Sequence, residues 1–293
     1  MDVALEFPTG LEGTSTTTTA GGNYTFDSIE EQSWTIEPEL LGELGDSIDE
    51  MDAALVLSAA TGETTLTPEQ MLAADVTGNG SISGVDASLI LQRVTGLIER
   101  FPVAYTCGSD WVFIPRPAGE PPVGDQTVTQ PQISDGECVP GSITLEPLVG
   151  VIGGRDFLAL AFGDVDGSWV SVTAGEGAGD EGVEDLPMEL GHPRLRGASA
   201  QIPIEVIPQG PYRGLYLVIE YDPATVTIHG LRRVLEARDL LVVINDTEPG
   251  RLVVAAASAV DIETPAPFVL DVETSVRKGY PDVSITEADV GLR

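Results

Sequence analysis

The chain has 293 residues, of which 42% are hydrophobic, and its 14 Lys plus Arg against 47 Asp plus Glu give a formal charge of −33. Such a field repels nucleic acid and anionic membranes and attracts cations. The hydrophobic content is enough for folded cores, so the acidity belongs to the surface and does not indicate disorder. No apolar run is long enough to insert into a membrane, and the length leaves room for two or more domains.

The first 38 residues alternate polar and apolar side chains as β-strands do. Asp2–Leu5 predicts a first strand, and TTTTAGGNYTF (16–26) is followed by WTIEP (34–38). This stretch resembles the carboxypeptidase-regulatory-like, Cna-B-type sandwich, in which a threonine-rich strand turns through Gly-Asn into a Tyr-x-Phe strand. Only the later strands of such a domain are present. The resemblance implies a partial β-sandwich over 1–38 that serves as a stalk or spacer.

The next segment repeats itself at an offset of 34 residues. DAALVLSAATG (52–62) and DASLILQRVTG (86–96) share six of eleven positions, and DVTGNGSISGVD (75–86) stands directly before the second copy. Calcium takes six to eight oxygen ligands, which an EF-hand-type loop supplies from positions 1, 3, 5, 7, 9 and 12, with Gly at position 6. The predicted calcium ligands are Asp75, Thr77, Asn79, the Ser81 carbonyl, Ser83 and Asp86. The alternative is a solvated Asn79-Gly80 turn before a helix.

Helix signals surround this loop. Asp86 begins a helix whose inward side chains are predicted to be Leu89, Ile90, Val94 and Leu97. Thr67 followed by Pro68 and Gln70 is typical of a helix N-cap with Pro at the first helical position.

Residues 39–101 therefore resemble a dockerin, a calcium-dependent module made of two F-hands (loop plus exiting helix) joined by a linker helix. The resemblance implies Ca²⁺ as cofactor and a cohesin-type protein partner. In that family, the residues directly before loop position 12 contribute to recognition of the partner. In this chain those residues are Glu50-Met51 and Gly84-Val85, whereas well-known members of the family have a small hydroxyl pair. This difference also allows an intramolecular, structural role for the helices.

The first loop of the repeat is incomplete. Its positions 1 and 5 are Leu41 and Gly45, which offer no side-chain oxygen, although Ile48 and Asp52 fit positions 8 and 12. The segment GDVDGS (163–168) has the pattern of the missing front half. We predict a split second calcium site, with the alternative of an ordinary Asp-rich turn between strands. Its residues would be Asp164, Asp166, Ser168, Ser47 and Asp52.

Residues 102–171 are predicted to be a β segment that packs on the dockerin-like helices. The expected strands are 111–114, 142–145 and 156–162. Cys107 and Cys138, the chain's two cysteines, flank a Pro-rich stretch and predict a disulfide and an oxidising compartment. Two free thiols or half of a metal site are the alternatives.

Small, acidic and Gly-rich residues at 172–186 predict a flexible linker. A β-rich segment, 187–293, follows, with strands expected at 200–206, 215–221, 240–244, 250–257 and 268–272. The strand IPIEV, the strand-turn EYDP (220–223) and the strand GRLVVA resemble a cohesin-like sandwich, the receptor module for dockerins and a relative of carbohydrate-binding sandwiches.

The fold class expected is thus multidomain and mainly β, with β-sandwich segments flanking a small helical module. We expect a non-enzymatic, extracellular calcium-binding protein of protein–protein assembly or adhesion, secreted or at the cell surface, and part of a longer protein because no signal peptide begins the chain. The alternative is the accessory, carbohydrate-binding portion of a secreted polysaccharide-degrading enzyme. That alternative needs a row of exposed aromatics, for which Tyr212, Tyr216 and Tyr221 are candidates.

Overall fold

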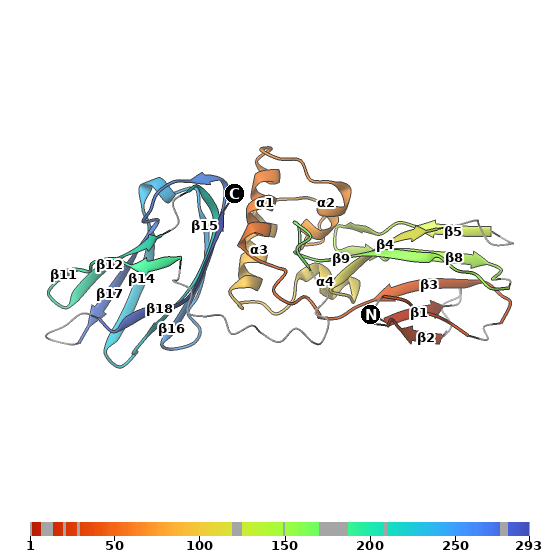
Figure 1. The fold of residues 1–293 in the computed structure, drawn as a ribbon, viewed down its shortest axis with the longest axis horizontal. Helices are drawn as coiled ribbons and strands as arrows, with labels where there is room; N and C mark the ends of the chain where they lie inside the picture. The colour runs from red at the N-terminus through yellow and green to blue at the C-terminus, as the bar shows by residue number, and fades with distance from the viewer. Residues whose placement is uncertain are drawn as a thin grey trace. The chain divides into compact units, whose positions relative to one another are not determined.

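The computed structural model describes residues 2–6, 14–19, 22–27, 30–118, 125–148, 150–169, 187–207, 210–275 and 281–292. It is mainly β with a short helical region, as expected (Figure 1). The chain forms two compact units that interleave in sequence: residues 1–47, 66–82 and 100–176 make the first, and 48–65, 83–99 and 177–293 the second. The predicted linker 172–186 lies outside the described residues.

The first unit contains an antiparallel sheet in the order β2-β1-β3-β8-β5. Its strands are β1 (Asp2–Glu6), β2 (Thr14–Thr17), β3 (Trp34–Glu39), β5 (Asp125–Thr129) and β8 (Ser142–Glu146). β3 pairs with β8, with Trp34 opposite Leu145, and these two side chains share a core with Ile36 and Ile143. One sheet thus joins the predicted segments 1–38 and 102–171. Tyr24–Phe26, predicted as a strand, is not one.

The rest of the first unit surrounds two short helices. Its elements are β4 (Trp111–Pro117) paired with β9 (Arg155–Ala161), the hairpin β6 (Gln132–Ser134) and β7 (Glu137–Val139), α2 (Pro68–Ala74) and α4 (Pro102–Cys107). Helix α2 begins as predicted, since Thr67 and Gln70 form a capping box. It lies on the β segment through bonds from Gly163 N to Ala73 O (2.9 Å) and from Gln70 Nε2 to Val165 O (3.0 Å).

The second unit contains a sandwich of two antiparallel sheets. One has the order β10-β12-β17-β14, with β11 beside β12, and the other has the order β15-β16-β13-β18. The strands are β10 (Met188–Leu190), β11 (Arg194–Arg196), β12 (Ser199–Val206), β13 (Tyr212–Tyr221), β14 (Val226–Arg233), β15 (Leu241–Asn245), β16 (Arg251–Ile262), β17 (Phe268–Thr274) and β18 (Val283–Leu292). A short 3₁₀ turn, Leu235–Ala237, precedes β15. Side chains of both sheets, such as Ile204, Leu217, Val254 and Leu270, are fully buried between them.

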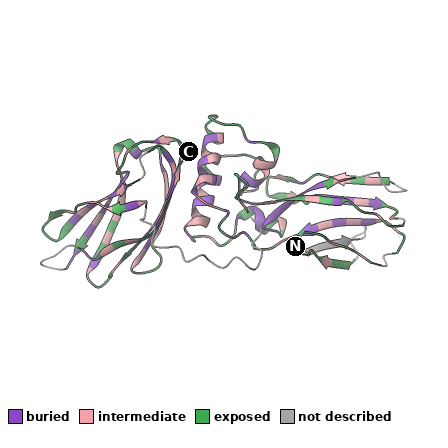
Figure 2. Ribbon diagram, in the orientation of Figure 1, coloured by how far each residue is buried: buried purple, intermediate pink, exposed green. Residues whose placement is uncertain are grey.

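Two further helices belong to this second unit. Helices α1 (Glu50–Ala60) and α3 (Gly84–Val94) contact each other and the β15-β16-β13-β18 sheet. The residues of the predicted dockerin-like module are therefore divided between the two units: α1 and α3 pack on the C-terminal sandwich, and α2 packs on the β segment. Figure 2 shows buried residues along α1.

Helix α3 corrects one detail of the predicted inward face. Ile90 and Leu91 are fully buried, whereas Leu97 is 40% exposed. The helix ends at Val94, with Thr95 as its C-cap and Gly96 at φ 74°. The helical period therefore stops before it reaches Leu97. None of the helices in the described parts of the chain has the length and apolar character needed to cross a bilayer.

Candidate metal centres

The loop that begins at Asp75 is organised around one buried carboxylate. Asp75 Oδ1 accepts hydrogen bonds from Gly78 N (2.9 Å), Asn79 N (3.1 Å) and the Thr77 hydroxyl (2.9 Å), and Oδ2 accepts one from Gly80 N (2.7 Å). Gly78 and Gly80 have φ values of 74° and 80°, a left-handed backbone that glycine adopts without steric cost. These hydrogen bonds and glycines thus allow the loop to fold around the side chain of Asp75, its position 1.

Two elements hold this loop from outside. Gly136 N, in the turn of the β6–β7 hairpin, donates to Gly78 O (3.0 Å), and Val103 N of α4 donates to Val76 O (3.1 Å). A disulfide joins Cys107 at the end of α4 to Cys138 in β7, with a Cα–Cα distance of 5.2 Å. The crosslink therefore connects the two elements that clasp the loop.

The turn at 164–169 repeats the hydrogen-bond pattern of the Asp75 loop. Asp164 Oδ1 accepts from the amides at positions i+3 and i+4, Gly167 (3.0 Å) and Ser168 (2.9 Å), and Oδ2 accepts from the amide at i+5, Trp169 (3.2 Å). Asp75 uses the same oxygens for the same three offsets. Gly167, at the fourth position like Gly78, has φ 76°. The turn therefore has the backbone form of the front half of the other loop.

The first unit also brings Ser47 to this turn. Ser168 Oγ donates to the Ser47 carbonyl at 3.2 Å, across 121 positions. In the predicted split loop these are positions 5 and 7, the second being a backbone-carbonyl ligand. Trp169 Nε1 donates to Glu43 O (2.8 Å), and the Trp169 ring stands edge-on to Trp111 at 5.0 Å, so aromatic packing supports the junction of the two segments.

Asp166 lies in the same turn, where its Oδ1 accepts from Ser168 N (2.9 Å), and Ser81 N donates to Asn79 Oδ1 (2.8 Å). Three further predicted ligands belong to the second unit. Asp86 is fully buried in the first turn of α3, where its Oδ2 accepts from Ser83 N and Ser83 Oγ, both at 2.9 Å. Asp52 is fully buried at the same place in α1 and accepts from Asp49 N (3.0 Å). Both carboxylates thus have the capping role that position 12 has at the start of an exiting helix.

The donor sets match a hard cation. Every predicted ligand atom is an oxygen of a carboxylate, amide, hydroxyl or carbonyl group, which suits Ca²⁺ and does not suit thiolate- or imidazole-seeking metals. Burial raises the pKa of Asp164, against the amide hydrogen bonds from Trp169 and Ser168 that favour its charged form. A bound cation would offset the cost of burying that charge.

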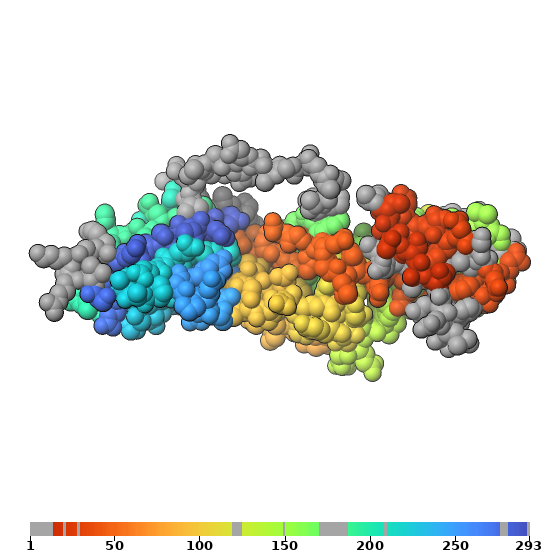
Figure 3. Space-filling model, turned by 90° about the horizontal axis from the view of Figure 1, so that it is seen from below, coloured from red at the N-terminus to blue at the C-terminus, as the bar shows by residue number. Residues whose placement is uncertain are grey.

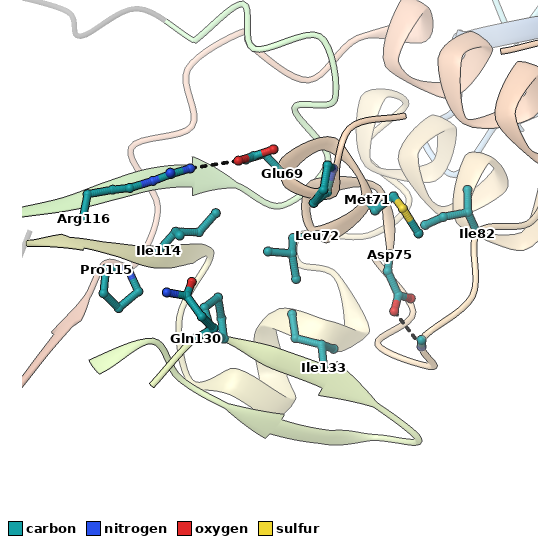
Figure 4. Close-up of a pocket in the computed structure, with 13 residues that line it drawn as sticks. Glu69, Met71, Leu72, Asp75, Ile82, Ile114, Pro115, Arg116, Gln130 and Ile133 are labelled. Carbon is teal, nitrogen blue, oxygen red and sulfur yellow. Dashed lines mark hydrogen bonds and ion pairs between the residues drawn. The ribbon is translucent and has the colours of Figure 1, made fainter. Parts of the chain in front are cut away.

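A pocket of about 630 Å³ opens beside the Asp75 loop (Figure 4). Its wall includes Leu72 of α2 and Ile114 of β4, and Arg116 pairs with Glu69 at 2.8 Å on one side. The two carboxylates of its lining, Glu69 and Asp75, are held by this ion pair and by the loop amides respectively. The lining therefore presents no pair of carboxyl groups poised for acid–base catalysis.

The three tyrosines considered for glycan binding do not form an exposed row. Tyr212 is buried in the sandwich core, where its hydroxyl donates to Thr264 O at 2.7 Å. Tyr221 packs against the same core, and Tyr216 lies on strand β13 between buried neighbours.

The described residues contain two oxygen-rich turns, at 75–80 and 164–169, and two helices, α1 and α3, that each have a buried Asp in the first turn. Residues 45–95 match the family model of the dockerin type I domain, which confirms the dockerin resemblance for this segment. No curated protein matches the chain significantly.

Similar solved structures are cohesin modules and cohesin–dockerin complexes. One is a cohesin module from a family 33 glycoside hydrolase of Clostridium perfringens, with 14% identity over 36% of this chain and 84% of that chain and a TM-score of 0.29. Another is the Coh-OlpA–Doc918 complex from Clostridium thermocellum, with 15% identity over 36% and 87% and a TM-score of 0.30. A third is CaCohA2 from Clostridium acetobutylicum, with 15% identity over 36% and 77% and a TM-score of 0.28.

Some parts of the site had no signal in the sequence. The β6–β7 hairpin, 132–139, lies far from the Asp75 loop in sequence and binds it through backbone groups. Backbone hydrogen bonds can form whatever the side chain is, so no residue type in the sequence marked this contact. The Trp169 amide is another such group. The Trp169 side chain was a possible sequence signal for this contact, since an indole beside an Asp-rich turn is uncommon on a solvated surface.

Proposed function

We propose that this chain is a non-catalytic, extracellular calcium-binding protein of protein–protein assembly, in which the dockerin type I segment engages a cohesin-type partner. The observation that carries the proposal is the family match over 45–95 together with the oxygen ligands spaced along 75–86. The disulfide supports an oxidising compartment, and the acidic surface suits a calcium-rich exterior.

Two calcium ions are proposed. One is held by Asp75, Thr77, Asn79, the Ser81 carbonyl, Ser83 and Asp86. The other is held by Asp164, Asp166, Ser168 and the Ser47 carbonyl, and the hydrogen bond from Ser168 Oγ to Ser47 O supports this second site. Asp52 is the predicted position-12 ligand of that second site; it follows Ser47 by five residues, and its participation stays a prediction.

Bound calcium would supply an electrostatic link among the oxygen ligands of each loop. The residues of the chain supply the rest: the Asp75 and Asp164 carboxylates order their turns, and Ser83 and Asp86 cap α3. Since α1 and α3 are short, each gains stability from interactions outside the helix itself.

Calorimetric titration of the chelator-stripped full chain with Ca²⁺ tests this function. We expect binding of two ions by the native chain and of one by Asp75→Ala. The matched control is Glu63→Ala, which removes an exposed carboxylate outside both loops and should keep two. A native chain that takes up no calcium would contradict the proposal.

A further inference from the structure

The outer face of the β15-β16-β13-β18 sheet is covered although it faces away from the sandwich core. Along β16, Leu252, Val254 and Ala256 point into the core, as the two-residue period of a strand requires. The intervening residues Val253, Ala255 and Ala257 are only 3%, 0% and 0% exposed. Helices α1 and α3 contact this strand, and the small side chains let a helix approach closely.

The first turn of α1 packs against two glycines of the sheet, which have no side chain to separate the helix from the strand backbone. Gly214 of β13 and Gly291 of β18 are opposite each other in the sheet. A Cβ on Gly214 would lie 2.3 Å from Glu50 Cγ, and a Cβ on Gly291 would lie 2.3 Å from Met51 Sδ. The residues that the sequence places just before position 12 of the first loop are therefore the ones that contact the sandwich.

Polar contacts fix the position of both helices on the sheet. Ser58, two helical turns after Glu50 on the same face of α1, donates from Oγ to Ala259 O at 2.8 Å and accepts from Arg213 Nη1 at 3.1 Å. At the C-cap of α3, the Thr95 carbonyl accepts from Asn245 Nδ2 at 2.8 Å. Figure 3 shows the sandwich atoms around β15 directly against those of the α3 segment.

The sandwich does not need the helices to complete its own core. Every buried member of that core lies between Met188 and Val290, and so does every partly buried residue packed on it. The contact with α1 and α3 therefore lies on the outer face of the sheet, apart from the core between the two sheets, and its buried apolar centre is of the kind found in a protein–protein interface.

We propose that the chain's own C-terminal sandwich is the partner of its dockerin helices, so that α1 and α3 are occupied in cis. The inference rests on the proposed assembly function, whose partner it names. Because both parts belong to one polypeptide, their effective concentration reaches the millimolar range typical of linked modules. A sandwich on another molecule must compete with the one in cis.

The test uses the full chain with a specific protease site in place of residues 175–180. The protein is purified with Ca²⁺, cut, and passed over a sizing column with light-scattering detection. Before cutting we expect the mass of one chain. After cutting we expect the two pieces to elute together.

Two variants locate the interface. Gly291→Gln introduces a side chain where Met51 lies and should make the cut pieces separate, whereas Gly210→Gln, at an exposed glycine with no atoms nearby, should leave them together. Ser58→Arg changes the helix and leaves the sandwich sequence intact, so its pieces should also separate even if Gly291→Gln fails to fold.

Separation of the native pieces in calcium overturns the proposal, and so does a native chain that elutes as a dimer before cutting. Co-elution of the Ser58→Arg pieces also overturns the assigned face. Calorimetry on the same samples separates the two ideas: calcium uptake without co-elution refutes cis docking alone, and co-elution without calcium uptake refutes the calcium function alone.

Discussion

The hydroxyl of Ser168 donates a hydrogen bond to the backbone carbonyl of Ser47, which lies 121 positions earlier in the chain, at 3.2 Å. This contact joins the front half of one oxygen-rich loop to the back half of another. A loop made from two distant segments depends on the packing of the whole first unit. In the contiguous loop that begins at Asp75, local glycines at positions 78 and 80 allow the turn, and α4 and the β6–β7 hairpin support it from outside.

The Asp164 carboxylate should determine the stoichiometry of calcium binding. We expect Asp164→Asn to lower it from two ions per chain to one, because the substitution removes the charge at position 1 while keeping the size of the side chain. Titration calorimetry measures this. The control is Asp156→Asn, an exposed acid on the same β segment; two ions bound by Asp164→Asn would exclude the split site.

Trp169 should report on the split site alone. Its amide donates to Asp164 Oδ2 at 3.2 Å and its ring contacts Trp111, so a cation that draws Asp164 toward itself changes the indole environment. We expect calcium to change the tryptophan emission of the native chain and of Asp75→Ala. The change should vanish in Trp169→Phe and in Asp164→Asn. A response that disappears in Asp75→Ala would show that the other loop is being observed.

The disulfide should stabilise the fold and strengthen one calcium site. Replacing Cys107 and Cys138 together by Ser opens a loop with a sequence separation of 31 residues, which costs about 3–4 kcal/mol of unfolding free energy in the chain-entropy model. Because the bond joins α4 to the hairpin that clasps the Asp75 loop, calcium affinity should fall at 75–86. Urea unfolding and calorimetry measure the two effects. Equal weakening of the Asp164 site would argue for a general loss of structure.

The Tyr212 hydroxyl should make the sandwich sensitive to alkali. Burial raises its pKa above the ordinary value, so the folded chain keeps this proton at a pH where the unfolded chain loses it. The contribution of this buried hydroxyl to the free energy of unfolding is complete below pH about 10 and is lost as the pH rises further.

Tyr212→Phe tests this. At pH 8 it should lower the unfolding free energy by about 1 kcal/mol, because the Thr264 carbonyl loses its donor. The difference in unfolding free energy between the native chain and Tyr212→Phe, measured by urea unfolding, should narrow at pH 11. A gap that stays constant or widens with pH would contradict the assigned burial.

Local signals were enough to predict several elements of this fold. Thr67 and Gln70 placed the start of α2, the alternation along 200–206 placed β12, and the apolar stretch at 250–257 placed β16. Helix α4 has six residues and no hydrophobic period, so only Pro102 at its start marked it. Strand β18 is acidic on its exposed side and has no run of apolar residues that would predict it.

The predicted site residues were harder to assemble from the sequence. The spacing of 75–86 is a local property and could be read directly. The link from Ser168 to Ser47 followed from missing ligands at positions 1 and 5, and its geometry depends on tertiary packing. The division of the helices between two units was not predicted, because helix faces formed by Ala54 and Ser58 resemble an ordinary core-facing stripe until the sheet that covers them is known.

The glycine pair of β13 and β18 bears on which sandwiches the helices can choose. Gly214 and Gly291 contribute to recognition by lacking side chains. A sandwich of the same fold with a larger residue at either position is rejected on steric grounds, without any repulsive charge. In a chain with a formal charge of −33, shape at two backbone positions would provide a selectivity that does not depend on charge.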